Sequence, residues 1–225
     1  VEALVSPPHL IVFTGLVFLL TSPLILLWRR PVVSLGLVPS IAAVVSVVSA
    51  LLVTTLFTGF LSPMAGGLSL QQVYVEPLVG ESLSEYDQVR GLGIVVWSAV
   101  LVVAGFIPLL ARFRITPGLA FIGVAVLGLP PLIITHTSGP TSMFDASAGS
   151  TSQGAEPVLY GFVAAGILLE LCRILLARPV LGRLSSAITG ALVPAILWAV
   201  TFWSLESAGR LQWTPALRWG SVMLS

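Results

Sequence analysis

Long apolar runs separated by shorter polar stretches make up almost the whole chain. A run of about 20 apolar residues is long enough for a helix to cross a bilayer. We therefore predict about six membrane-spanning helices. The predicted spans are Pro8–Trp28, Val32–Leu61, Leu92–Leu110, Pro117–Ile134, Glu156–Ala177 and Leu184–Leu205. The pair Pro130-Pro131 is expected to kink or break the fourth span near one end.

The composition supports lipid as the main solvent. Of the 225 residues, 56% are hydrophobic and 8% are charged, and the mean hydropathy is +1.06. A soluble domain carries about 25% charged residues. Uninterrupted apolar runs favour helices over the alternating pattern of a transmembrane β-barrel. We predict an all-α, polytopic transmembrane bundle that contacts the lipid bilayer and binds no nucleic acid.

The polar stretches between the spans give no sign of a second folded unit. The main ones are Ser62–Gly91, His136–Ala155 and the Trp-containing Glu206–Arg218, which is typical of a membrane interface. No internal repeat is present, so residues 1–225 are interpreted as one transmembrane domain. The chain begins without Met and ends within the apolar run 219–225, so we expect it to be a segment of a longer protein.

Charged residues alternate in sign from one loop to the next. The loops after the first, third and fifth spans are rich in Arg, whereas eight of the nine acids fall on the opposite side. The positive-inside rule then predicts a multi-pass cell-membrane protein with both ends of this segment outside the cytoplasm. The arginines are Arg29, Arg30, Arg112, Arg114, Arg178 and Arg183, and the acids are Glu2, Glu76, Glu81, Glu85, Asp87, Asp145, Glu156 and Glu206.

Both histidines fall on the predicted extracytoplasmic side. His9 opens the first span after Pro7-Pro8, and proline suits the first turn of a helix. Imidazole with carboxylate or thioether groups is a ligand set that copper accepts, and a copper site would bind through His9, His136, Asp145, Met64 and Met143. The alternative interpretation is that these residues lie at the headgroup boundary without a metal.

A second candidate site lies inside the fifth span. Glu170 and Arg173 are three residues apart, so they share one helix face and are able to form an ion pair. A carboxylate within a membrane span suggests a functional site, such as one for proton transfer. The alternative is a structural ion pair in which Arg173 extends to the interface.

The stretch 5–15, which reads VSPPHLIVFTG, resembles a motif of the C subunit of particulate methane and ammonia monooxygenases. In that family a similar Pro- and His-containing segment opens a membrane helix, and its His is one of three copper ligands. The resemblance covers residues 1–112, with 113–225 as additional membrane helices. It implies a copper-dependent oxidoreductase subunit in which His9 matches a ligand position. The stretch Ser62–Gly91 contains neither Asn nor His, unlike the corresponding loop of the family.

Three functions remain open at this point. The first is a membrane subunit of a copper-dependent monooxygenase-like complex. The second is a non-catalytic subunit of a larger respiratory or photosynthetic assembly, which the short loops and sparse charge would suit. The third is a small transporter that uses Glu170 within the bilayer, with Gly- and Pro-rich spans that permit movement.

Overall fold

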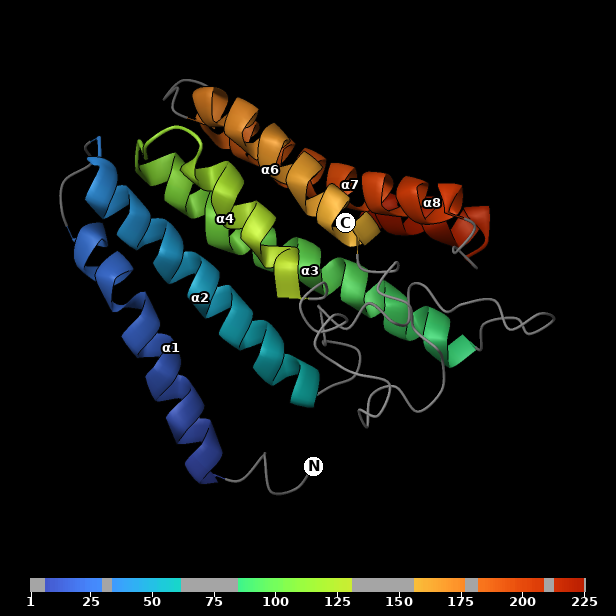
Figure 1. Cartoon of the computed structure of the whole chain (residues 1–225), viewed down its shortest axis with the longest axis horizontal. Coiled ribbons are helices and arrows are strands. Elements are labelled where there is room, and N and C mark those ends of the chain that lie inside the picture. Colours follow the sequence, from blue (N-terminus) through green and yellow to red (C-terminus); the bar gives the residue numbers. More distant parts are fainter. Residues whose placement is uncertain are drawn as a thin grey trace.

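The computed structural model describes residues 7–29, 34–61, 85–130, 156–176, 182–208 and 213–224. These residues are almost entirely helical, which confirms the predicted all-α fold class. The helices are α1 (Pro7–Trp28), α2 (Leu37–Leu61), α3 (Glu85–Arg112), α4 (Leu119–Leu127), α6 (Glu156–Leu176), α7 (Gly182–Ser207) and α8 (Pro215–Leu224). Figure 1 shows the long helices side by side as a bundle.

Five of these helices are long and apolar enough to cross a membrane. Their apolar segments are Leu10–Trp28, Leu37–Thr55, Gly91–Arg112, Glu156–Ile174 and Leu184–Ser207. Five of the six predicted spans are therefore present as candidate membrane helices, and the chain is a multi-pass membrane protein. The first, fifth and sixth predicted spans differ from α1, α6 and α7 by no more than two residues at either end.

The fourth predicted span, Pro117–Ile134, is interrupted in the structure, and Leu129 and Pro130 after the interruption are helical again. Its helix α4 ends at Leu127, and Gly128 forms the C-terminal cap. The residue before α4, Gly118, has φ of 85°, a left-handed conformation that a side chain with a Cβ rarely adopts. Glycine at each end thus limits α4 to nine residues. Residues 131–155 lie outside the described part of the chain.

Two predicted boundaries were wrong. The second helix begins at Leu37 rather than Val32, since Ser34 forms an isolated bridge with Arg114 and the Leu35 N–H donates to the Arg114 carbonyl at 3.0 Å. The third begins at Glu85 rather than Leu92, inside what the hydropathy pattern indicates to be a loop. Glu, Gln and Arg have good helix propensity, so a helix continues readily through them once it leaves the lipid.

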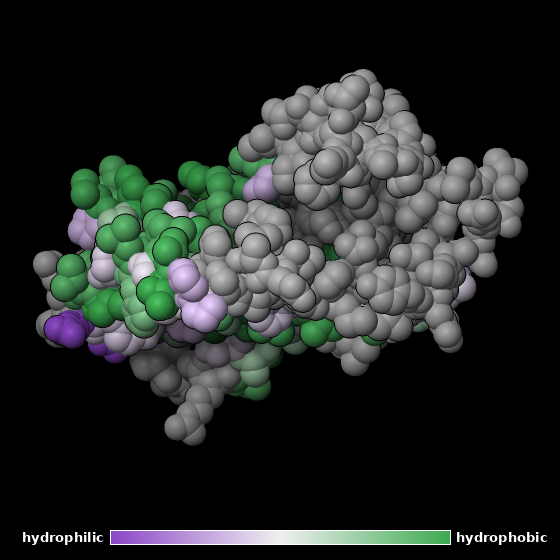
Figure 2. Space-filling model, turned by 90° about the horizontal axis from the view of Figure 1, so that it is seen from below, coloured by the Kyte–Doolittle hydropathy of each residue, from purple (hydrophilic) through white to green (hydrophobic). Residues whose placement is uncertain are grey.

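The helices form a layered bundle in which α6 and α7 pack most closely. Helix α4 lies between α2 and α6, α3 packs against α7 and α2, and α8 packs against the end of α7. Helix α1 lies at the edge beside α2 (Figure 1). Hydrophobic residues cover most of the coloured surface in Figure 2, and the most strongly hydrophilic ones gather at its left-hand end. This distribution suits a bundle whose sides face lipid.

The core is mainly aliphatic, and aromatic side chains gather where α3 meets α7. Phe106, Trp198 and Phe202 are buried, and the Trp198 and Phe202 rings stack with centroids 5.4 Å apart. The indole Nε1 of Trp198 donates to Ser98 Oγ at 3.2 Å, which connects α7 to α3. This bond gives the buried indole N–H of Trp198 a partner, which the buried indole N–H of Trp213 lacks.

Candidate functional site

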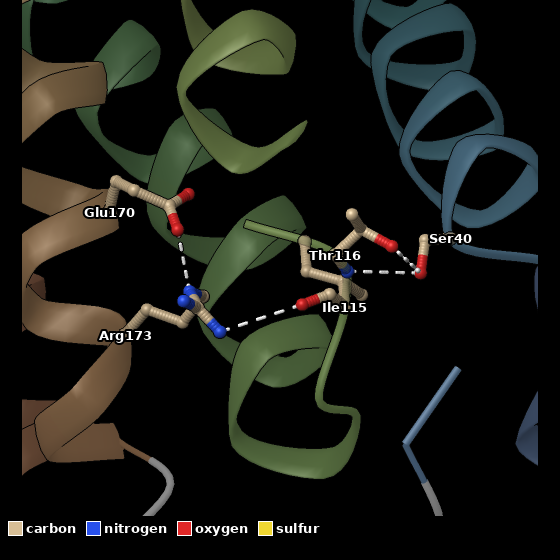
Figure 3. Close-up of polar contacts among 5 residues, drawn as sticks. All are labelled: Ser40, Ile115, Thr116, Glu170 and Arg173. Carbon is tan, nitrogen blue, oxygen red and sulfur yellow. Dashed lines mark hydrogen bonds and ion pairs between the residues drawn. The ribbon is translucent and has the colours of Figure 1, made fainter. Parts of the chain in front are cut away.

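The most polar part of the described bundle interior lies where α6 meets the connection between α3 and α4. Glu170 and Arg173 are one turn apart on α6, and both side chains point toward this connection (Figure 3). Arg173 Nε donates to Glu170 Oε1 at 2.6 Å, and the side chains are 22% and 21% exposed respectively. The structure therefore contains the ion pair whose spacing is apparent in the sequence.

The guanidinium of Arg173 also reaches the connecting segment. Its Nη1 lies 3.5 Å from the carbonyl oxygen of Ile115, which is long for a hydrogen bond. This carbonyl belongs to a non-helical residue, so it has no partner from a helical turn. Arg173 thus lies between a carboxylate of its own helix and the backbone of a neighbouring segment, and this position limits how far α6 can move away from that segment.

Ser40 on α2 connects to the same segment from the other side. The backbone N–H of Thr116 donates to Ser40 Oγ at 3.1 Å, and the two hydroxyl groups are 3.3 Å apart (Figure 3). Ser40 is completely buried. Together with the Leu35–Arg114 hydrogen bond, this contact gives the non-helical backbone of the connection partners that water cannot supply inside the bundle.

The C-terminal end of α1 is attached at the same place. Arg112 Nη2 donates to the carbonyl oxygen of Trp28 at 2.8 Å, and the guanidinium carbon lies 5.1 Å from the centre of the Trp28 ring. Trp28 also packs edge-on against Phe113, with centroids 5.4 Å apart. A cation at a helix C-terminus is favourable, because it faces the negative end of the helix dipole.

These contacts bring the described arginines of the predicted cytoplasmic loops to one end of the bundle. Arg29 follows Trp28, Arg112 and Arg114 flank Phe113, and Arg173 reaches Ile115. Glu206 and Arg218 form an ion pair in the other charged region, near the end of α7. The direction in which the bundle crosses the membrane remains a prediction from charge alone.

The Glu170 site offers one acidic group, the carboxylate of Glu170 itself. Oε1 is occupied by Arg173, whereas Oε2 is buried and has no hydrogen-bond partner. A buried acceptor without a partner is unfavourable, and a proton or a small cation would satisfy it. Among the described residues, no group of three or more His, Cys, Asp and Glu is close enough to hold a metal ion.

The predicted copper ligands fall almost entirely outside the described residues. His9 is placed only through its backbone, in the first turn of α1, in agreement with the helix start that Pro7-Pro8 predicts. Met64, His136, Met143 and Asp145 lie outside the described ranges. The copper site therefore stays a prediction.

The hydropathy pattern does not indicate the helix that contains Arg218. The stretch 206–218 is interpreted there as a polar interface, but residues from Pro215 onward form α8. In α8 the Arg218 guanidinium is buried, and its Nη1 lies 2.5 Å from Glu206 Oε2. Two sequence signals were available: proline at the first helical position, and apolar residues recurring at helical spacing after it.

Comparison of the chain with protein-family models, curated proteins and solved structures finds no match.

Proposed function

We propose that this protein is a subunit of a larger membrane assembly and that α1 is the helix through which it contacts its partners. The observation that supports this proposal is the uneven burial of the spans. Only 6% of the apolar window of α1 is buried within the chain, against 39% to 44% for the other four candidate spans. Helix α1 packs against α2 and leaves the rest of its surface available to another chain.

The exposed face of α1 suits a helix as partner. Gly15 is exposed, and a Cβ placed there would meet no atom within 4 Å. Small residues allow two membrane helices to approach closely, because association in lipid depends on packing rather than on the hydrophobic effect. Elsewhere in this chain, Gly161 and Gly166 of α6 are used in this way against α7 and α4. At Gly15 none of the residues that the structure describes takes the space.

The resemblance to the monooxygenase C subunits suggests which kind of assembly this is. In that form the assembly is a copper-dependent monooxygenase-like complex, and His9 contributes a ligand near the extracytoplasmic face. His9 lies in the first turn of α1, the helix that we propose to face the partner. Further ligands would come from His136, Asp145, Met64 and Met143 or from the neighbouring subunit, and the protein would also have to hold those ligands in position.

The coarse proposal is tested by isolating the native protein in a mild detergent and measuring the size of the particle. We expect a particle larger than the 23.6 kDa chain, and Gly15→Leu should release the chain from it by filling the space at the contact. Ala104→Leu, a matched small-to-large change at an exposed position on α3, should leave the particle intact. A wild-type chain that runs alone, or equal retention of both variants, would contradict the proposal.

The copper form needs a separate measurement. We expect metal analysis of the intact assembly to find copper, and His9→Ala to remove it without changing the particle size. An intact assembly that keeps its metals through purification but contains no copper would contradict the proposal of a copper-dependent complex. It would leave a non-catalytic subunit as the proposed function.

A second candidate function is transport of a proton or small cation, favoured by the unpartnered Oε2 of Glu170. We expect Glu170→Gln to abolish flux in proteoliposomes while the helical content stays unchanged, because the amide cannot exchange a proton in this way. Thr189→Val, which removes another buried oxygen without a partner, serves as the control and should preserve flux. If flux is unchanged in Glu170→Gln, transport through Glu170 is contradicted.

A further inference from the structure

Helix α8 presents an apolar face outward and carries a buried arginine on its inward face. The outward face consists of Pro215, Ala216, Trp219, Gly220 and Met223, all exposed and all apolar. The inward face contains Arg218, which is 8% exposed, Ser221, which is 1% exposed, and Val222, which packs against the core. A helix at a water interface places its apolar side against the protein and its polar side outward.

Arg218 and Ser221 both have a polar partner within the chain, although the buried Nε of Arg218 has none. Arg218 pairs with Glu206 of α7, and Ser221 Oγ donates to the Arg218 carbonyl at 2.7 Å. Bonds of this second kind also occur within the candidate spans, where Ser46 donates to Ala42 and Thr201 to Leu197. Such intrahelical bonds keep hydroxyl groups paired where no water is present.

The position of α8 places its outward face next to membrane-exposed surface. Helix α8 packs against the end of α7 and also contacts α3 (Figure 1). Trp213, just before α8, packs on Phe202 of α7 with centroids 5.2 Å apart and fills the space beside Gly91 of α3. Both neighbours belong to candidate spans, and Trp203 of α7 is also exposed, at 69%. Large apolar side chains are therefore exposed on both α7 and α8, and the exposed side chain of Glu206 lies near the end of α7.

We propose that α8 lies within the apolar layer of the membrane, with Trp219 and Met223 in contact with lipid acyl chains. Ten helical residues rise about 15 Å, roughly half of the hydrocarbon thickness, so α8 extends into one leaflet without crossing it. Burial of Arg218 follows from this location, because a guanidinium inside the apolar layer must face protein and a counter-charge. The proposal does not depend on the partner of α1.

The test uses single nitroxide labels on the full chain in liposomes, with Cys172→Ala as background, because Cys172 is the one cysteine and is buried. The label is placed at Met223→Cys, with Val45→Cys on the exposed face of α2 as the lipid reference and Ala208→Cys beyond α7 as the polar reference. Collision rates are measured with oxygen, which concentrates in lipid, and with a water-soluble nickel chelate.

We expect the ratio of oxygen to nickel collisions at 223 to match that at 45 and to exceed that at 208. A ratio at 223 equal to that at 208 would show that α8 faces water. Protection from both reagents would show that a protein surface, from a partner or a second copy, covers α8. Either result would overturn the proposal.

A second measurement needs no label. Brominated acyl chains quench tryptophan fluorescence on contact, and we expect the quenchable part of the signal to decrease in Trp219→Phe. A quenchable signal unchanged by Trp219→Phe would also count against lipid contact.

Discussion

At the scale of single residues, glycines determine how closely the helices approach. A Cβ on Gly161 of α6 would lie 2.5 Å from the carbonyl oxygen of Leu197 and would overlap the hydroxyl of Thr201, both on α7. Real Cβ atoms essentially never come so close to another atom, so this crossing of α6 and α7 requires the missing side chain. A backbone atom such as Leu197 O cannot rotate away, which makes the site less tolerant than one bordered by flexible side chains.

We expect Gly161→Ala to destabilise the bundle by about 1–3 kcal/mol, because the added methyl group forces α6 away from α7. The unfolding free energy in a detergent titration measures this effect. Gly15→Ala is the matched control, since no atom lies within 4 Å of its Cβ position. Its unfolding free energy should be unchanged or higher by up to about 1 kcal/mol. Equal effects at the two positions would contradict the close approach of α6 and α7.

The Glu170–Arg173 pair is also a property of individual side chains. We expect Arg173→Leu to cost about 1–2 kcal/mol, because the carboxylate then lacks its counter-charge, with the effect reduced by the one-fifth exposure of the pair. Replacing both residues by Leu should come within about 1 kcal/mol of the wild type, since no charge is left unpaired. Detergent unfolding of both variants is the measurement. A double variant less stable than Arg173→Leu would argue for a role of Glu170 beyond the pair.

At the scale of elements, the short connection between α3 and α4 organises one end of the bundle. Trp28 of α1, Ser40 of α2 and Arg173 of α6 all contact residues 112–116. The connection is non-helical, so its backbone groups depend on these neighbours for partners. The contacts hold α1, α2 and α6 at one point, in addition to the packing of α1 against α2.

We expect Ser40→Ala to destabilise the protein by about 1–3 kcal/mol, because the Thr116 N–H loses its acceptor in a buried position. Ser46→Ala is the control, since Ser46 is also buried but its hydroxyl donates to the Ala42 carbonyl of its own helix, and this change should cost less than about 1 kcal/mol. Amide exchange at Thr116 should become faster in Ser40→Ala alone. Unchanged exchange there would show that the hydrogen bond does not anchor the connection.

At the scale of the whole molecule, the distribution of charge determines the expected orientation. The described arginines of the predicted cytoplasmic side meet around residues 112–116, and the Glu206–Arg218 pair lies near the end of α7. Because positive charge is favoured on the cytoplasmic side, the arginine-rich region is expected to face the cytoplasm, and the end of α7 is expected to face the opposite side.

We expect cysteines at Ser34 and Ala208, in the Cys172→Ala background, to react from opposite sides of the membrane. An impermeant maleimide applied to intact cells should label position 208, and position 34 should react only after permeabilisation. The reverse pattern would overturn the predicted orientation, and labelling of both in intact cells would contradict the arrangement of the spans. Both positions are exposed, so access through the protein does not limit the reaction.

The sequence by itself determined the fold class and the positions of most spans. Apolar runs of membrane-crossing length have few alternatives, because lipid leaves the backbone no partner outside a helix or a closed barrel. For the same reason, the limits of α1, α6 and α7 follow closely from where the apolar residues begin and end. The spacing of Glu170 and Arg173 indicated the possibility of a pair, because helical geometry alone places such residues on one face.

Only the tertiary structure decided which surfaces meet. The contact between Ser40 and Thr116 joins residues 76 positions apart, and no local pattern encodes it. The nearly complete exposure of α1 and the inward-facing Arg218 of α8 depend in the same way on neighbouring helices. Hydropathy measures the preference of a residue for lipid over water, but lipid and the interior of a bundle are about equally apolar. A sequence of apolar helices therefore specifies that they enter the membrane, while packing between them selects their neighbours.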